Sequence, residues 1–211
     1  MFGTQDLWLF ISAGIALNLV PGQDFVFVAS RSASQGFRAG SVAALGVGAG
    51  TLVHIFAATF GISALLAASA NAYTIIKVLG GLYLLYMGLS MLLKRTAPAN
   101  SVAVSLSTSS NKTIFYQGFL TNALNPKVAL FFIAFVPQFI ASDSSNVSLS
   151  FLFLGFVFSF NGFIWCLIVA WFSANISAKL KYHVHLKRCS NILAGGLFSY
   201  FGISLLMSSN H

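Results

Sequence analysis

One acidic residue stands beside a helix-breaking pair in an apolar stretch near the start of the chain. Asp24 follows Pro21 and Gly22 within NLVPGQDFVF, residues 18–27. Proline removes a backbone donor and glycine loosens the chain, so the pair predicts a break in any helix that runs through it. A carboxyl group in apolar surroundings can accept an ammonium group or a proton. We therefore predict that Asp24 binds a substrate or carries a proton, with Gln23 beside it in the same pathway.

A second stretch, LTNALNPKVALFF, carries matching features with the opposite charge. Lys127 follows Pro126, and Asn122 and Asn125 stand within a turn of this proline, as Asn18 does in the first stretch. A broken helix leaves backbone groups that need partners, which these amides can supply. We expect Lys127 and the N–H groups where the helix restarts to attract a carboxylate. The two poles would suit a zwitterion; a simple kink and a snorkelling lysine are the plainer alternatives.

The composition places these residues in a membrane. Of the 211 residues, 57% are hydrophobic and 7% are charged, whereas a typical soluble domain is about 25% charged. A charge in the middle of a bilayer costs at least about 2.5–3.5 kcal/mol, so Asp24 and Lys127 indicate a pathway. We predict an all-α membrane protein with six spans, each long enough to cross a bilayer: Leu7–Ser30, Val42–Leu66, Tyr73–Leu93, Ile114–Ile140, Leu149–Ile176 and Ile192–Met207.

Basic residues fall in alternate loops between these spans. Positive loops stay in the cytoplasm, so both termini are predicted to lie outside it, in the periplasm or beyond. The same distribution argues against nucleic-acid binding, because the charges do not gather on one soluble element. Nine of the eleven Lys and Arg residues lie in the first, third and fifth loops: Arg31, Arg38, Lys94, Arg95, Lys112, Lys179, Lys181, Lys187 and Arg188.

The two halves of the chain resemble each other. KVLGGLYLLYMGLSMLL (77–93) matches NILAGGLFSYFGISLLM (191–207) with one gap, and the two proline stretches pair independently. Inverted repeats with broken helices are typical of secondary transporters. We predict one domain over 1–211, with repeat one at 1–95, a linker at 96–112 and repeat two at 113–211. The first and fourth helices are broken, and chance similarity between Gly-rich stretches is the alternative.

Other polar residues within the spans give weaker signals. His54 could join a proton relay or make a packing hydrogen bond, and Asn161 could line the pathway. His183 and His185 lack a neighbouring acid or thiolate, so we predict no metal site and no cofactor. The spans contain no paired Ser/His, Asp/Asp or metal-ligand set, so we do not expect an enzyme.

Both proline stretches resemble signatures of the LysE/RhtB family of amino-acid exporters. NLVPGQDFVFVASRSASQGFRAGSVAALGVGAG (18–50) is similar to the family's opening motif, in which Pro-Gly-Pro-Asp leads to a Gly-spaced second helix. GFLTNALNPKVALFFIAFVPQF (118–139) is similar to the second motif, Asn-Pro-Lys before aromatics and Pro-Gln-Phe. Gln23 departs from the family, where a second proline is usual. The resemblance covers nearly the whole chain and maps functional positions onto Pro21, Gly22, Asp24, Asn125, Pro126 and Lys127.

The resemblance implies a multi-pass protein of the bacterial inner membrane that exports amino acids or derivatives, driven by an ion gradient. With a single carboxylate in the spans, we expect a small neutral substrate, such as threonine, homoserine or leucine, and proton antiport. An ion channel or cation efflux transporter is the alternative, although a cation pathway usually contains more than one acidic residue. An intramembrane enzyme is less favoured. The expected partners are the amino acid and the lipid bilayer, and the small size leaves room for a homodimer.

Overall fold

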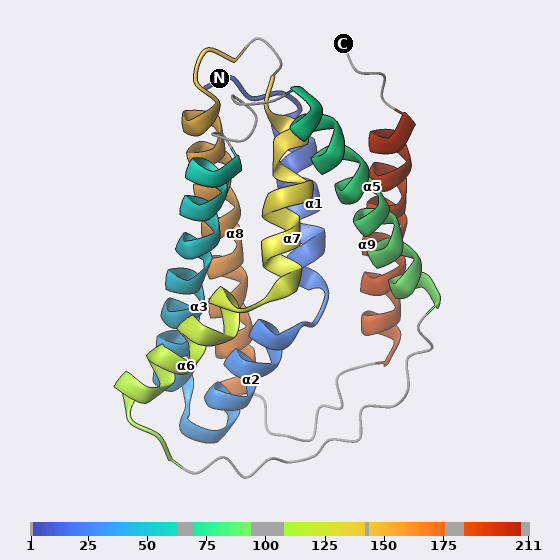
Figure 1. Ribbon diagram of the computed structural model, residues 1–211. Helices are drawn as coiled ribbons and strands as arrows, with labels where there is room; N and C mark the ends of the chain where they lie inside the picture. Colours follow the sequence, from blue (N-terminus) through green and yellow to red (C-terminus); the bar gives the residue numbers. More distant parts are fainter. Residues whose placement is uncertain (1, 63–69, 94–107, 142–143, 176–183, 208–211) are drawn as a thin grey trace.

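The computed structural model describes residues 2–62, 70–93, 108–141, 144–175 and 184–207, and nearly all of them are helical (Figure 1). One isolated bridge, between Thr4 and Ile140, ties the start of the chain to the second half. In chain order the elements are α1 (Leu7–Leu19), α2 (Gln23–Gln35), α3 (Phe37–Ala57), the π-helical turn η1 (Ala58–Ile62), α5 (Ala70–Leu93), α6 (Asn111–Ala123), α7 (Pro126–Ala134), the 3₁₀ turn η2 (Val136–Phe139), α8 (Val147–Asn175) and α9 (Val184–Met207).

Two helix pairs are bent at the prolines that the sequence singled out. The axes of α1 and α2 meet at 56°, and α6 meets the segment Pro126–Phe139, which contains α7 and η2, at 47°. Gly22, the N-cap of α2, and Asn125, the N-cap of α7, are both extended. Pro126 is the first residue of α7, where its missing N–H removes no helical hydrogen bond. Each predicted break therefore separates two short helices that meet at an angle.

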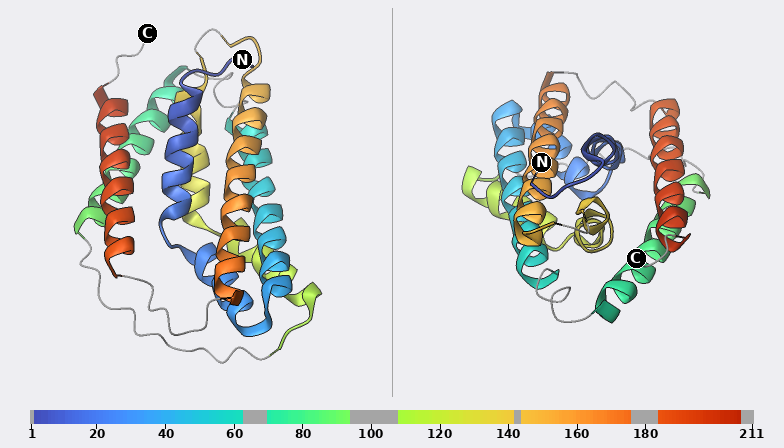
Figure 2. Two further views of the ribbon diagram at one scale, coloured as in Figure 1. Left: turned by 180° about the vertical axis from the view of Figure 1, so that it is seen from behind. Right: turned by 90° about the horizontal axis from the view of Figure 1, so that it is seen from above.

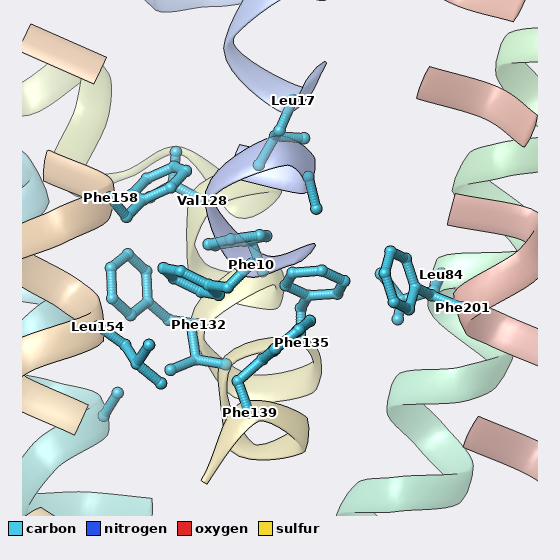
Figure 3. Packing of buried hydrophobic residues seen from close by; sticks show 14 of the residues in the cluster. Phe10, Leu17, Leu84, Val128, Phe132, Phe135, Phe139, Leu154, Phe158 and Phe201 are labelled. Atoms are coloured by element: carbon cyan, nitrogen blue, oxygen red, sulfur yellow. The ribbon is translucent and has the colours of Figure 1, made fainter. Parts of the chain in front are cut away.

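Helices α3 and α8 lie on one side of the central pair α1 and α7, α5 and α9 lie on the other, and α2 and α6 lie below the pair (Figures 1 and 2). An aromatic cluster joins these layers (Figure 3). Phe131 of α7 stacks on Phe158 of α8 with 4.5 Å between ring centroids. On the other side, Phe135 meets Phe201 of α9 edge to face at 4.9 Å. The broken helices are thus held in the middle of the molecule by side chains from both sides.

Helices α5 and α9 contain the two matching Gly-rich stretches, and these pack against each other. A Cβ added at Gly88 would stand 2.6 Å from Ser199 N and 2.7 Å from Gly195 O. A Cβ at Gly202 would stand 2.8 Å from Gly81 O. Because only glycine allows such close approach, the similar sequences reflect the same packing demand on both partners.

The chain has the character of a multi-pass membrane protein. By length and composition, Phe37–Gly61 and α8 can each cross a bilayer, and the count among the described residues rises to four if each bent pair forms one span. The six-span count and the 3+3 inverted repeat stay predictions. The linker predicted at 96–112 lies mostly outside the described residues, and α6 begins at Asn111.

The predicted first loop is wrong in its extent. Helix α2 continues to Gln35 and α3 begins at Phe37, so Gly36 alone separates them. Its φ of 84° lies in the region that glycine tolerates and other residues avoid. Arg31, expected in this loop, is instead a buried residue of α2.

Candidate functional site

Asp24 lies at the first break and is bound by amides from the second. It is the second residue of α2, where the positive end of the helix dipole favours a carboxylate. Its Oδ2 accepts hydrogen bonds from Asn122 Nδ2 at 3.0 Å and Asn125 Nδ2 at 3.1 Å. Its Oδ1 is buried without a partner. Oδ2 of this carboxylate is therefore held by two amides, and Oδ1 is available to a ligand.

Lys127 makes the reverse contact, from the second break to the first. Its Nζ donates to the carbonyl oxygens of Leu17 at 3.0 Å and Val20 at 3.3 Å. Helix α1 ends at Leu19, so its last carbonyls lack intrahelical partners, and the ammonium group supplies one. The role predicted for Lys127, attraction of a substrate carboxylate, stays a prediction, because here the group serves the backbone of α1.

Equivalent positions supply the ligands at the two breaks. Leu17 and Val20 stand four and one residues before Pro21, and their carbonyls bind the ammonium group. Asn122 and Asn125 stand four and one residues before the second proline, and their side chains bind the carboxylate. Each break thus supplies one charged side chain that binds polar groups of the other break.

Thr51 and His54 of α3 support the second break from behind. Thr51 Oγ1 donates to Asn122 Oδ1 at 3.2 Å, which leaves the Nδ2 of that amide directed to Asp24. His54 Nε2 lies 2.9 Å from the carbonyl oxygen of Asn122, and its ring stacks near Phe132. Both sequence-based readings of His54, proton relay and packing, are compatible with this position.

A small cavity of about 60 Å³ lies between the breaks and is walled by α1, α2, α3, α6, α7 and α8. Apolar side chains such as Val47, Phe163 and Val169 complete its lining. Six of the polar side chains that line it come from five of these helices or the breaks between them: Asn18, Asp24, Asn122, Asn125, Lys127 and Trp165. The five residues predicted to bind substrate or proton are therefore brought together.

Two further candidate residues, Gln23 and Asn161, are not part of the cavity lining. Gln23 is the exposed first residue of α2 and is not part of the cavity lining. Asn161 is half-buried in α8, where its neighbour Gly162 lines the cavity and Asn161 does not. Of the histidine pair considered for metal, His183 lies outside the described residues and the side chain of His185 is not described. Among the residues that are, no group of three or more metal-ligating side chains could hold an ion.

Trp165 was not among the residues predicted for the site. Its indole lines the cavity, and Nε1 is buried without a partner. A signal was present in the sequence, because Gly162, Cys166 and Val169 recur at helical spacing and form one face of α8. Reading that face as a unit would have placed the indole at the cavity.

A second polar cluster lies toward the other end of α2. Arg31 Nη2 donates to Gln117 Oε1 at 2.7 Å, and Nη1 donates to Ser109 Oγ at 3.2 Å. The side chain of Gln35 donates to the carbonyl of Ser109 at 3.0 Å. These contacts join α2 to α6 and to the residues just before α6. Because Asp24 and Asn122 connect the opposite ends of the same two helices, α2 and α6 are joined at both ends.

Comparison with known proteins decides the family. Residues 15–209 match the family model described as LysE type translocator. The chain belongs to this family. The translocator is 31% identical over 204 residues to a leucine efflux protein of Enterobacter sp. (strain 638), with 97% of this chain and 96% of that protein covered. A leucine efflux protein of Salmonella typhi is 28% identical over 204 residues, with the same coverage.

A further relative is an uncharacterized membrane protein of Pseudomonas aeruginosa, 28% identical over 206 residues that cover 96% of this chain and 95% of that protein. No solved structure matches the translocator at a significant level. The family match confirms the resemblance that the two proline stretches indicated.

Proposed function

We propose that this translocator exports a small neutral amino acid, leucine-like in character, from the cytoplasm in exchange for protons. The observation that carries the proposal is the carboxylate of Asp24, held on one oxygen and open on the other at the cavity between two broken helices. Two relatives that match along nearly their whole length are named leucine efflux proteins, which supports this class of substrate.

One carboxylate can couple the two fluxes by serving two ligands in turn. Ionised Asp24 accepts the ammonium group of the amino acid at its open oxygen, and a proton bound there removes the charge that holds the ammonium group. Protonation from the outer side then releases the substrate, and the proton travels inward when the empty carrier returns. Because both ligands compete for one group, each amino acid exported is exchanged for one proton.

The hydrogen bonds that the two charged side chains make between the breaks suit a carrier that changes shape. Residues Asp24 and Lys127 fasten α1 and α2 to α6 and α7 at the centre, where small rotations of half-helices can alter access. The cavity between the breaks is small, about 60 Å³. Substrate binding therefore requires these half-helices to move apart.

We further propose the setting that the sequence predicts: a bacterial inner membrane, six spans arranged as an inverted repeat, and both termini outside the cytoplasm. The matched Gly-rich contact between α5 and α9 supports the repeat, since each half contributes one partner. A reporter fused to the C-terminus that is active only in the cytoplasm should therefore remain inactive.

The test is transport in proteoliposomes with radiolabelled leucine and a set pH gradient. We expect the gradient to accelerate leucine flux in the wild type and to have no effect in Asp24→Asn. Asp6→Asn is the matched control, because Asp6 is exposed at the start of α1. An Asp24→Asn protein with unchanged rate and pH dependence would sink the proposal. Cation flux without any amino-acid transport would favour the channel or cation-efflux alternative.

A further inference from the structure

Three buried polar atoms at the cavity have no hydrogen-bond partner: Asn18 Nδ2, Asp24 Oδ1 and Trp165 Nε1. They come from the end of α1, the start of α2 and the middle of α8. Nearly all buried polar groups in folded proteins are paired, so three such atoms around one cavity require an explanation. A ligand that enters the cavity can supply the missing partners.

The chemistry of the three atoms defines that ligand. Asp24 Oδ1 accepts hydrogen bonds and carries negative charge, whereas the Asn18 amide and the Trp165 indole can only donate through these nitrogens. A metal cation would satisfy Asp24 and leave both donors unpaired, and an inorganic anion would do the reverse. A molecule with an ammonium group and a carboxylate satisfies all three.

Lys127 already serves the backbone at the first break. Its Nζ donates to Leu17 O and Val20 O; turning away would take this donor from Val20 O, while Leu17 O would keep the backbone N–H of Val20. The neutral donors Asn18 and Trp165 have no competing partner.

We propose that Asn18 and Trp165 bind the substrate carboxylate while Asp24 binds its ammonium group, so that these two donors select α-amino acids over amines. This inference rests on the proposed export of amino acids and assigns the binding contacts within it. Lys127 acts as a positioning residue that keeps the end of α1, and with it Asn18, in place.

Gly162 keeps the space in front of the Asn18 amide open. A Cβ added there would stand 3.5 Å from Asn18 Nδ2 and 3.6 Å from its Oδ1, which is ordinary contact rather than a clash. Gly162→Ala should therefore fold normally yet occupy the place of the carboxylate. This variant separates loss of the binding space from loss of the fold.

The experiment is leucine counterflow in proteoliposomes, which needs no pH gradient, with unlabelled leucine or leucinamide as competitor. Leucinamide keeps the ammonium group and lacks the carboxylate. In the wild type we expect leucine to compete about tenfold better or more, the ratio that one hydrogen bond to a charged group gives. Trp165→Phe, Asn18→Leu and Gly162→Ala should each reduce this ratio toward one by weakening leucine.

Trp171→Phe is the control, because Trp171 lies on the same helix with its side chain exposed. The thermal stability of each variant without substrate is measured beside transport. Trp165→Phe removes the unpaired donor but also part of a ring that packs against a buried cluster, so a lower melting temperature reports lost packing and the test is read from the competition ratio.

The proposal is overturned if Trp165→Phe and Asn18→Leu keep the wild-type preference for leucine over leucinamide while counterflow continues. In that case amino-acid export itself would stand. A wild-type protein that exchanges no neutral amino acid would instead remove the proposed function, and the assigned contacts with it.

Discussion

Replacing Lys127 by methionine tests whether the hydrogen bonds from its ammonium group to the first break stabilise the fold. Methionine keeps most of the length and the apolar stem of the side chain, so the change removes chiefly the ammonium group. Two contacts are lost, to Leu17 O at 3.0 Å and to Val20 O at 3.3 Å. The carboxylate of Asp24 is left behind without a nearby positive charge.

The expected loss follows from the kind of contact. A hydrogen bond to a charged group contributes about 1.5–3 kcal/mol, and two such bonds are lost here. We take about 3 kcal/mol as the expected decrease in the free energy of unfolding. For a chain of this size, 1 kcal/mol corresponds to about 2–4 °C, so Lys127→Met should melt about 6–12 °C below the wild type.

The assay is thermal unfolding of the purified protein in one detergent, followed by the fraction that stays monodisperse. Lys112→Met serves as the control, because Lys112 is exposed at the start of α6. The double variant Asp24→Asn/Lys127→Met should lose less than the sum of the single losses, by about 0.5–3 kcal/mol, since each charge removed relieves the other. The reasoning is refuted if Lys127→Met melts with the control.

Three further predictions concern helix packing, the cavity and the polar cluster around Arg31. Gly50→Ala should lower stability by about 1–3 kcal/mol through overpacking, because its Cβ would stand 2.6 Å from Phe119 O. Gly48→Ala is the control and should melt as the wild type does, because the Cβ there would meet only one atom, at 3.9 Å. Equal melting temperatures of the two variants would contradict the geometry. In a Cys189→Ser background, leucine should slow alkylation of Cys166, because this residue lines the cavity. Mass spectrometry of the labelled peptide gives the alkylation rate. A rate that is the same with and without leucine counts against a binding site there. Arg31→Lys should destabilise the fold by about 1–3 kcal/mol in the same melting assay, because lysine cannot reproduce the forked contacts to two partners; an unchanged melting temperature would mean that these contacts contribute nothing.

Local chemistry explains why the breaks could be predicted from the sequence. Pro21 and Pro126 restrict the backbone wherever they occur, and the helices bend beside both of them. The apolar runs predicted a helical membrane protein because a long stretch without charges has no other stable setting. Asp24 could be selected because it is the one acidic residue within any such run.

Helix ends were harder to predict, because apolarity marks contact with lipid rather than the end of a helix. The polar segment around Arg31 reads as a loop, yet it is helical up to Gly36. Its polar side chains are satisfied by residues such as Gln117, which are distant in the sequence.

The sequence by itself determined the membrane character, the two breaks, and the identity of the charged residues at them, since each follows from a residue's own properties or from those of its neighbours. The tertiary structure alone decided what those charges bind. Asp24 meets an amide 98 residues away, and Lys127 meets a carbonyl 110 residues away. It also decided that Trp165, rather than Asn161, faces the cavity, because the packing of α8 against α1, α2 and α3 sets the rotation of this helix.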